Sequence, residues 1–110
     1  DKAIKRFPAS EPVHSAAADL KSLNKDYGSA YSLFKKATEV DVNSDRAWVG
    51  LAQSSLELQK NDESLKSFER ACQANKKSVR EFRMAVGKLR TRGEHEWAMK
   101  FENSMSSHCE

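Results

Sequence analysis

Residues 48–71 decide the fold, and they read WVGLAQSSLELQKNDESLKSFERA. Small and apolar side chains recur in this stretch at steps of three or four residues, which is the spacing of one face of a helix. A polar break, Lys60-Asn61-Asp62, separates two such patterns. The stretch therefore predicts two helices joined by a short turn. Their buried faces are expected to carry Ala47, Trp48, Leu51, Ala52 and Ser55 on the first helix and Leu65, Phe68, Ala71 and Cys72 on the second.

A fixed step of 34 residues relates this stretch to its flanks. Phe34 and Phe68 are 34 residues apart, and so are Trp48 and Phe82. A step of this length is typical of stacked helical hairpins that cannot bury their apolar faces alone. An unrelated six-helix bundle with an accidental period is the alternative. The same step joins Ala37 with Ala71, and it relates three triplets: Ala30, Ser64 and Ala98; Ala17, Leu51 and Ala85; Ala18, Ala52 and Val86.

Capping residues mark where the helices are expected to begin and end. Asp26-Tyr27-Gly28 indicates a turn and a helix start, and Asn43-Ser44-Asp45 is an N-cap cluster. Residues 78–81 match the capping box, in which the side chains of Ser78 and Glu81 each accept a hydrogen bond from the other's backbone N–H. Gly93 fits a left-handed C-terminal cap. Six helices result, the first over residues 11–24, and the fold class is all-α.

Composition is consistent with one helical domain. The chain has 110 residues with only 4 Gly and 2 Pro, and 32% of the residues are charged. This scarcity of backbone breakers excludes collagen-like and Pro-rich disordered chains. No apolar run approaches the ~20 residues that span a bilayer. The chain starts at Asp1 with no signal-peptide pattern, so we expect a fragment or a processed chain.

The two cysteines are too few for the framework of a disulfide-dense secreted domain. We expect Cys72 to be a small core residue and Cys109 to be an exposed thiol in the tail. Both expectations assume a reducing compartment, and we predict a cytoplasmic location.

The sequence contains none of the phosphate-binding, nucleotide-binding, zinc-protease or serine-hydrolase motifs that would indicate an enzyme. His95-Glu96 lacks a second histidine four residues further on, and His108-Cys109 supplies only two adjacent ligands, which do not make a closed metal site. Cys72 occupies a packing position rather than the polar setting of a reactive thiol. We therefore predict a non-enzymatic chain with no metal and no cofactor.

The central unit resembles the tetratricopeptide repeat family. That family's pattern is W-x2-L-G-x2-Y followed by A-x3-F, and this chain has Trp48-x2-Leu51-Ala52-x2-Ser55 followed by Ser64-x3-Phe68. The resemblance covers about residues 11–107. It implies a right-handed α-α superhelix of three antiparallel hairpins, with units at about 11–44, 45–78 and 79–107, a linker or poorly ordered segment over 1–10 and a tail over 108–110. The chain departs from the pattern at His14 and Glu102, which replace large apolar residues, and at Val42 and Lys76, which replace the boundary proline.

The resemblance also implies that the first helix of each hairpin lines a concave groove for a peptide. Residues 76–92 hold seven basic residues and one acidic residue, a net charge of +6 in a chain of net charge +3. The arginine guanidinium group binds carboxylates in a bidentate manner, so we predict a protein or peptide partner with acidic character. A solvated charged helix face is the alternative. The predicted groove residues are Arg46, Val49, Gln53 and Leu56 in the second unit and Arg80, Arg83, Met84 and Arg90 in the third.

Three other functions are weighed against this one. Repeats that clamp the acidic tails of heat-shock chaperones use Lys and Asn in the first unit, Asn in the second, and Lys and Arg in the third. This chain has Ser15, Asp19, Gly50, Arg80 and Met84 at those places, and only Arg80 is compatible with that role. Nucleic-acid binding through residues 78–92 is less favoured, because Phe82, the one aromatic residue there, is assigned to packing. Self-association through the last helix is the third alternative, with Trp97, Phe101 and Met105 packing on a second copy.

Overall fold

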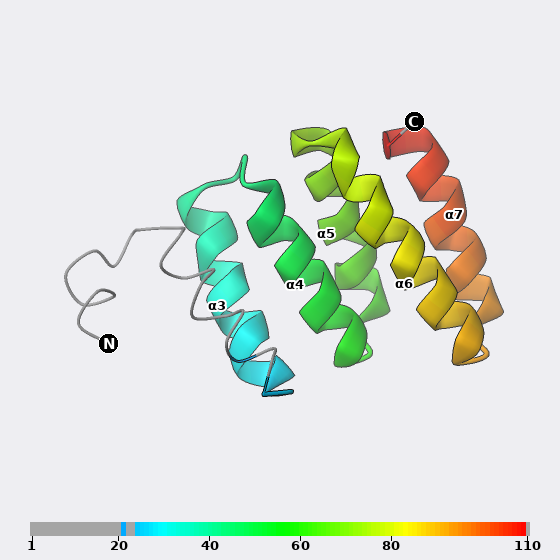
Figure 1. The fold of residues 1–110 in the computed structure, drawn as a ribbon, viewed down its shortest axis with the longest axis horizontal. Helices are drawn as coiled ribbons and strands as arrows, with labels where there is room; N and C mark the ends of the chain where they lie inside the picture. Colours follow the sequence, from blue (N-terminus) through cyan, green and yellow to red (C-terminus); the bar gives the residue numbers. More distant parts are fainter. Residues whose placement is uncertain (1–20, 22–23, 110) are drawn as a thin grey trace.

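The computed structural model describes residues 21 and 24–109 (Figure 1). Within this part the chain forms five α-helices and one 3-10 turn, with no strand, which confirms the all-α class. The predicted helix over 11–24 and the segment over 1–10 lie outside the described residues, apart from Lys21 and Asn24. The elements are α3 (Tyr27–Val40), α4 (Asp45–Glu57), α5 (Asn61–Ala74), the 3-10 turn η1 (Lys76–Ser78), α6 (Val79–Thr91) and α7 (His95–Cys109).

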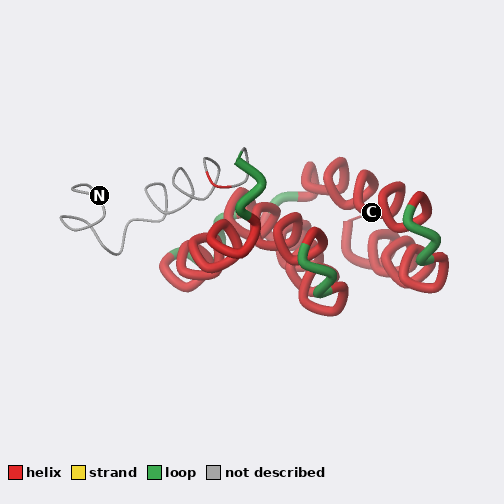
Figure 2. The backbone as a smooth tube through the Cα atoms, turned by 90° about the horizontal axis from the view of Figure 1, so that it is seen from below, coloured by secondary structure: helices red, strands yellow, loops and turns green. Residues whose placement is uncertain are grey.

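The helices stand side by side in a row of antiparallel hairpins. Helices α4 and α5 form one hairpin, α6 and α7 form the next, and α3 packs against α4. Helix α5 lies behind the space between α4 and α6, and it also packs against α7 (Figures 1 and 2). Helix α5 therefore supplies the surface between α4 and α6.

Side-chain caps begin α3 and α4 at the predicted residues. The carboxylate of Asp26 accepts a hydrogen bond from the Ser29 backbone N–H at 3.3 Å, and the hydroxyl of Ser44 accepts one from Ala47 at 3.2 Å. Each cap satisfies a backbone donor that the first helical turn leaves without an intrahelical partner. Both predicted helix starts are confirmed.

The turns that precede α3, α5 and α7 repeat one backbone geometry at the 34-residue step. Lys25, Gln59 and Gly93 have φ angles of 60°, 62° and 80°. In each turn the next residue's N–H donates to the carbonyl five residues back, from Asp26 to Lys21, from Lys60 to Ser55 and from Glu94 to Leu89. This is the hydrogen bond that closes a helix on a left-handed residue. The cap predicted at Gly93 is confirmed, and its equivalents at positions 25 and 59 use residues that give no sequence signal.

The predicted capping box at Ser78 is wrong. Ser78 has helical backbone angles, its side chain makes no capping hydrogen bond, and its hydroxyl is buried without a partner. The helical backbone begins earlier, in η1, where the Asn75 side chain accepts a hydrogen bond from the Lys77 N–H at 3.0 Å. Because Ser78 already lies inside the 3-10 turn, it cannot act as the N-cap, and Asn75 takes that role.

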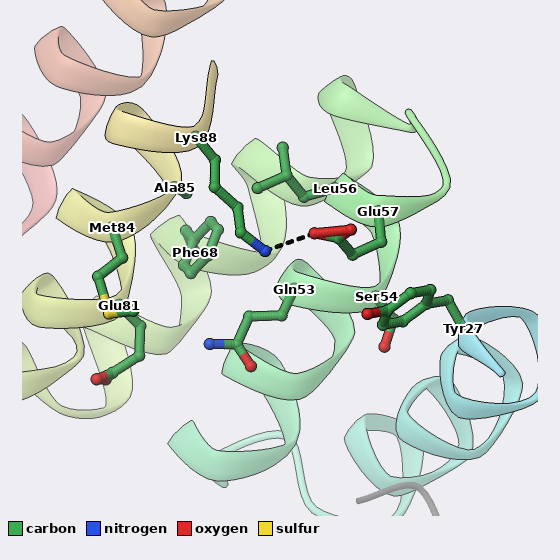
Figure 3. Close-up of a pocket in the computed structure, with 10 residues that line it drawn as sticks. All are labelled: Tyr27, Gln53, Ser54, Leu56, Glu57, Phe68, Glu81, Met84, Ala85 and Lys88. Carbon is green, nitrogen blue, oxygen red and sulfur yellow. Dashed lines mark hydrogen bonds and ion pairs between the residues drawn. The ribbon is translucent and has the colours of Figure 1, made fainter. Parts of the chain in front are cut away.

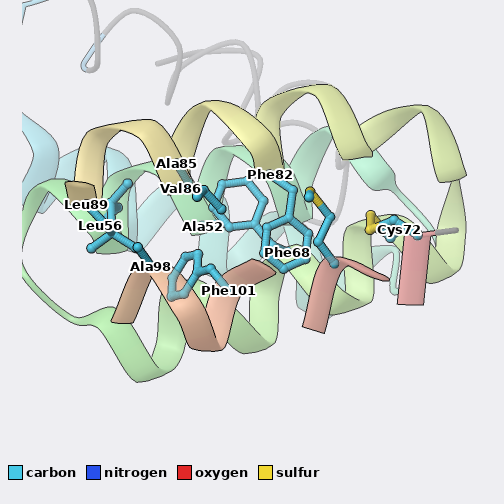
Figure 4. Close-up of a cluster of buried hydrophobic side chains, with 12 residues drawn as sticks. Ala52, Leu56, Phe68, Cys72, Phe82, Ala85, Val86, Leu89, Ala98 and Phe101 are labelled. Carbon is cyan, nitrogen blue, oxygen red and sulfur yellow. A yellow bond between two sulfur atoms is a disulfide. The ribbon is translucent and has the colours of Figure 1, made fainter. Parts of the chain in front are cut away.

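Three phenylalanines from three helices form the centre of the main core (Figure 4). Phe68 of α5 stacks on Phe82 of α6 with ring centroids 5.0 Å apart, and Phe101 of α7 meets both rings edge-on at 6.3 and 5.8 Å. All three side chains are fully buried. Phe82 therefore packs inward, as the repeat predicts.

A second cluster joins α3 to α4. It contains Ala30, Phe34 and Leu51, with the half-buried Trp48 packed against them. Gly50 lies where the two helices approach closely, because a Cβ atom there would overlap the Phe34 ring. The small residues predicted at helix contacts are indeed at such contacts.

Buried hydroxyl groups hold the α4–α5 hairpin close. Ser64 of α5 is fully buried, and its hydroxyl donates to the Ala52 carbonyl of α4 at 2.8 Å. Ser55 donates within α4 to the Leu51 carbonyl at 2.7 Å. Serine can therefore replace the small apolar residue and the tyrosine of the repeat pattern, since each hydroxyl finds a backbone acceptor.

The departure at Glu102 has a local explanation. Phe101, one residue earlier, fills the core, while Glu102 reaches back to α6 and pairs with Arg90 at 2.6 Å. The third unit thus keeps an aromatic residue in its core at a position shifted by one.

The expectation of two free thiols is wrong. Cys72 of α5 and Cys109 of α7 form a disulfide, with Cα atoms 5.2 Å apart (Figure 4). Helix α7 continues through Cys109, which is buried, so residues 108 and 109 belong to the helix rather than to a tail. Sequence spacing alone could not place these two residues together, because their proximity depends on how α7 packs against α5.

Most of the apolar area of the three residues named for self-association is used within the chain, and self-association itself stays a prediction. Phe101 is fully buried, Met105 is 9% exposed, and Trp97 packs against the main core. Their apolar area is used within the hairpin row. In the described part of the chain, no helix combines the length and the apolar character that crossing a membrane requires.

Candidate functional site

A cavity of about 470 Å³ opens between α4 and α6, with α5 at its base (Figure 3). Pockets that bind small ligands or peptide side chains have volumes of roughly 300–1,000 Å³. The cavity exists because α4 and α6 are neighbours in the row without packing tightly along their whole length. Its lining residues are Tyr27, Gln53, Ser54, Leu56, Glu57, Phe68, Glu81, Met84, Ala85 and Lys88.

The centre of the cavity is apolar. Phe68 reaches it from α5 and Leu56 from α4, and both side chains belong to the main core. Met84 of α6 stands at the side with 65% of its surface exposed. An exposed thioether beside core aromatic surface adapts its shape to an incoming apolar side chain.

Charged groups stand around this apolar centre. The Lys88 ammonium of α6 and the Glu57 carboxylate of α4 form an ion pair at 2.5 Å, which links the two helices across the cavity (Figure 3). Glu81 lines the cavity one turn before Met84 and pairs with the Arg80 guanidinium at 3.5 Å. The Gln53 amide, on an exposed residue, offers both a donor and an acceptor for a peptide backbone.

Three of the eight predicted groove residues line this cavity, namely Gln53, Leu56 and Met84. The other five do not. Arg46 and Val49 lie on the first half of α4, exposed and half-buried respectively. Arg80 and Arg83 are exposed on the first turns of α6, and Arg90 is paired with Glu102 of α7.

Sequence reasoning missed three cavity-lining residues on α6 and four on other helices. Those on the other helices are Tyr27 of α3, Ser54 and Glu57 of α4, and Phe68 of α5. On α6 the lining residues are Glu81, Met84, Ala85 and Lys88, whereas the predicted ones are Arg80, Arg83, Met84 and Arg90. The two sets differ by about one residue, so a small error in helix rotation exchanges acidic and basic residues. The helical steps of three and four residues from Met84 could have identified Glu81 and Lys88.

A second hollow, of about 490 Å³, lies between α3, α4 and α5, where Trp48 and Leu51 contribute from α4. Glu63 at its edge accepts a hydrogen bond from the Tyr31 hydroxyl at 2.7 Å and lies 3.8 Å from Lys35. Burial, and then the hydrogen bond to Glu63, raise the pKa of Tyr31, and the hydrogen bond to Tyr31 raises the pKa of Lys35. The cavity between α4 and α6 is the better candidate site, because it is lined by Met84, an apolar side chain that is largely exposed.

The part of the chain that the structure describes contains no cluster of side chains that could bind a metal ion. No group of three or more His, Cys, Asp or Glu side chains there is placed to hold an ion. The cavity offers apolar surface, one amide and a bridging ion pair, and this set suits binding.

Comparison with known proteins finds a similarity to a short segment of a much longer protein. No protein-family model matches the chain. Over 75 residues it is 31% identical to anaphase-promoting complex subunit 3 of Schizosaccharomyces pombe. The similar segment covers 68% of this chain and 11% of that protein, so the chain spans about a tenth of the length of the curated relative that it matches. This helical chain is thus similar to a short segment of a protein whose name describes it as a subunit of a complex.

Proposed function

We propose that this chain is a non-enzymatic protein-interaction module of the tetratricopeptide type, within a larger scaffold or assembly. We also propose the finer architecture that goes with this type, a right-handed superhelix of three hairpins whose first helix covers residues 11–24. The similarity to a subunit of a multiprotein complex supports a role in assembly. In this proposal the cavity between α4 and α6 receives a segment of the partner.

The observation that carries the proposal is exposed apolar surface inside a cavity that is open to solvent. Met84 is 65% exposed beside the buried ring of Phe68. A partner side chain of aliphatic or aromatic type would cover this surface and gain the free energy of apolar burial. Gln53 would bond the partner's backbone, which fixes its direction.

The acidic character of the partner is the finer part of the proposal. Arg80 and Arg83 are exposed, and each directly precedes a cavity-lining residue of α6. Arg80 is paired with Glu81, so a partner carboxylate there would compete with that pair. A carboxylate flanking the apolar anchor would reach either guanidinium without entering the cavity. Lys88 stands at the other end, and a second carboxylate would compete there with Glu57.

Ion pairs within the structure weigh against the nucleic-acid alternative. Four of the seven basic residues in 76–92 have an acidic partner. These pairs lower the density of uncompensated positive charge that phosphate binding requires. A protein partner with both an apolar and an acidic residue uses the surface more fully.

The test uses a displayed library of random peptides selected on the immobilised 110-residue chain. Selected peptides are expected to carry an apolar residue next to Asp or Glu. Met84→Glu places a charge in the cavity and is expected to weaken their binding at least tenfold, as measured by calorimetry. Met99→Glu is the matched control, because Met99 is 64% exposed on α7, away from the cavity.

Methyl NMR locates the bound peptide independently of the substitutions. The chain has three methionines, of which Met84 lines the cavity, Met99 is exposed on α7 and Met105 is buried. Only the Met84 signal is expected to shift strongly on titration. Peptides that shift Met99 instead, or that bind the Met84→Glu variant unchanged, would refute the proposed site.

Charge reversal tests the acidic character separately. The double substitution Arg80→Glu with Arg83→Glu is expected to weaken the binding of acidic peptides by tenfold or more. The affinity for neutral apolar peptides should stay within about twofold. Lys66→Glu with Lys100→Glu is the control with the same change in net charge. If both pairs of substitutions weaken binding equally, the effect is one of overall charge and the acidic preference is refuted.

A further inference from the structure

The Cys72–Cys109 disulfide joins the end of α7 to α5 across 37 residues of sequence. Cys72 and Cys109 are the two cysteines of the chain, and both are almost fully buried, at 1% and 5% exposed. Their Cα separation of 5.2 Å lies within the range that a disulfide spans without moving the backbone. The pairing therefore follows from how α7 packs on α5.

Contacts other than the disulfide hold α7 at residues 101–105 rather than in its last turn. Phe101 is in the core, Met105 is nearly buried, and the Ser104 hydroxyl bonds the Glu69 carboxylate of α5. In the last turn, the His108 ring bonds the Ser104 carbonyl of its own helix, at 3.0 Å. Cys109 thus provides the covalent link to α5 at the end where helices fray first.

We propose that this disulfide is a redox latch that holds the second half of α7 on α5. A dithiol reductant opens the latch in two exchange steps. One of its thiolates attacks a sulfur of the bridge and forms a mixed disulfide, and its second thiol then displaces the protein sulfur. Two electrons and two protons pass to the protein, which gains the Cys72 and Cys109 thiols, and the reductant leaves as a disulfide.

The open state has a looser α7 because the chain regains the conformational freedom that the bridge removes. Because closing a loop of this length also restricts the unfolded ensemble, opening the latch lowers the stability of the whole fold as well. The last turn then keeps only local hydrogen bonds, and the apolar face around Met105 opens with it. Helix α3 is joined to α4 by a separate cluster and is expected to be unaffected.

The latch also reaches the cavity, and this step rests on the proposed function. Phe68 lies one turn before Cys72 on α5 and contacts Phe101 of α7 edge-on at 6.3 Å. It is also part of the cavity lining. Loosening of α7 therefore removes one side of the support for Phe68 and weakens partner binding.

The first experiment tests the latch without any partner. Intact mass under non-reducing conditions should show the loss of two hydrogen atoms relative to two thiols. Incubation with dithiothreitol at neutral pH should restore them, lower the thermal midpoint by roughly 10–20 °C and speed hydrogen exchange of residues 101–109 by at least about tenfold. Exchange in α3 should change by less than about twofold.

Variants separate the bridge from side effects of the reductant. Cys72→Ser and Cys109→Ser, alone and together, should reproduce the exchange pattern of the reduced chain, and dithiothreitol should not change them further. The latch is overturned if the purified chain keeps two free thiols in air. It is also overturned if the native disulfide resists dithiothreitol, or if α7 is equally protected in both states.

The second experiment separates the latch from the proposed function. Affinity for a selected acidic peptide is measured with the oxidised chain, the reduced chain and the double serine variant. Weaker binding in both latter forms, by about threefold or more, supports coupling to the cavity. A change in α7 exchange with unchanged affinity keeps the latch and refutes the coupling, whereas failure to bind any peptide refutes the function alone.

Discussion

At the scale of the residue, Gly50 determines how closely α3 approaches α4. A Cβ atom at position 50 would overlap carbons of the Phe34 ring. Phe34 is 3% exposed, so its ring has little room to move away. Glycine is therefore needed there for packing, although it weakens the helix in which it stands.

Substitution of this glycine tests the close approach. We expect Gly50→Ala to lower the free energy of unfolding by about 1–3 kcal/mol, because overpacking in the cluster outweighs the gain in helix propensity. Gly87→Ala on α6 is the matched control, since nothing lies within 4 Å of its added Cβ atom. The free energy of unfolding of that control should rise by up to about 1 kcal/mol. Urea unfolding monitors both, and a Gly50→Ala chain as stable as Gly87→Ala would contradict the packing explanation.

Single residues also show where the sequence could be interpreted correctly and where it could not. The small and aromatic residues at the 34-residue step were predicted to be at helix contacts, and Ala30, Ser64 and Phe82 are. Their spacing carries the information directly. The Ser78 capping box failed because its pattern is local, whereas the actual helix start depends on η1 and on Asn75.

At the scale of the element, three turns share a left-handed residue but differ in its identity. Gly93 adopts this conformation without cost, whereas Lys25 and Gln59 carry a Cβ atom that disfavours it by roughly 1 kcal/mol. The repeat preserves the geometry at the expense of two strained positions. The hydrogen bonds that close each turn, at 2.8–2.9 Å, offset the strain.

The strain at position 59 is testable because Gln59 is exposed. We expect Gln59→Gly to raise the free energy of unfolding by about 0.5–1 kcal/mol, since the left-handed φ of 62° suits glycine. The reverse change, Gly93→Ala, should lower it by about 1 kcal/mol. Thermal unfolding of both variants provides the measurement. A loss of stability in Gln59→Gly would mean that the greater freedom of the unfolded chain dominates.

At the scale of the whole molecule, Tyr31 ties α3 to α5 through Glu63 and gives stability a dependence on alkaline pH. Burial, and then the bond to Glu63, raise the pKa of Tyr31 above its ordinary value near 10. The neutral phenol is thus favoured in the folded state. Its contribution is fully present below the unfolded-state pKa and is lost as pH rises through the folded-state pKa.

This dependence can be followed by tyrosinate absorbance and by urea unfolding above about pH 9. Tyr31→Phe should flatten the decline in stability in that range, and Glu63→Gln should shift the Tyr31 pKa back toward normal. Lys35, whose pKa is also raised, adds a decline in the same direction, so the absorbance signal is needed to identify the phenol. Tyr27→Phe is the control. An unchanged alkaline profile in Tyr31→Phe would show that the tie does not exist in solution.

The arrangement of the whole also explains which part of the site could be predicted. Gln53, Leu56 and Met84 follow from the helical steps and from the family's groove. Phe68 was assigned to packing alone, but it serves both the core and the cavity, because α5 lies behind the space between α4 and α6. Ion pairs such as Arg90 with Glu102 depend on which helices are neighbours, and a single-helix pattern does not contain that information. The cytoplasmic location stays a prediction.

The bridge between residues 72 and 109 also changes how the molecule would carry mechanical load. Tension applied through a tether beyond Cys109 passes directly to α5, because the bridge bypasses α6 and most of α7. The 36 residues between the cysteines, 73–108, are then shielded from the pull. Their contour length, about 130 Å at roughly 3.5 Å per residue, is released only after the bridge is cut. Stretching the two chemical states would thus give two different unfolding lengths from one sequence.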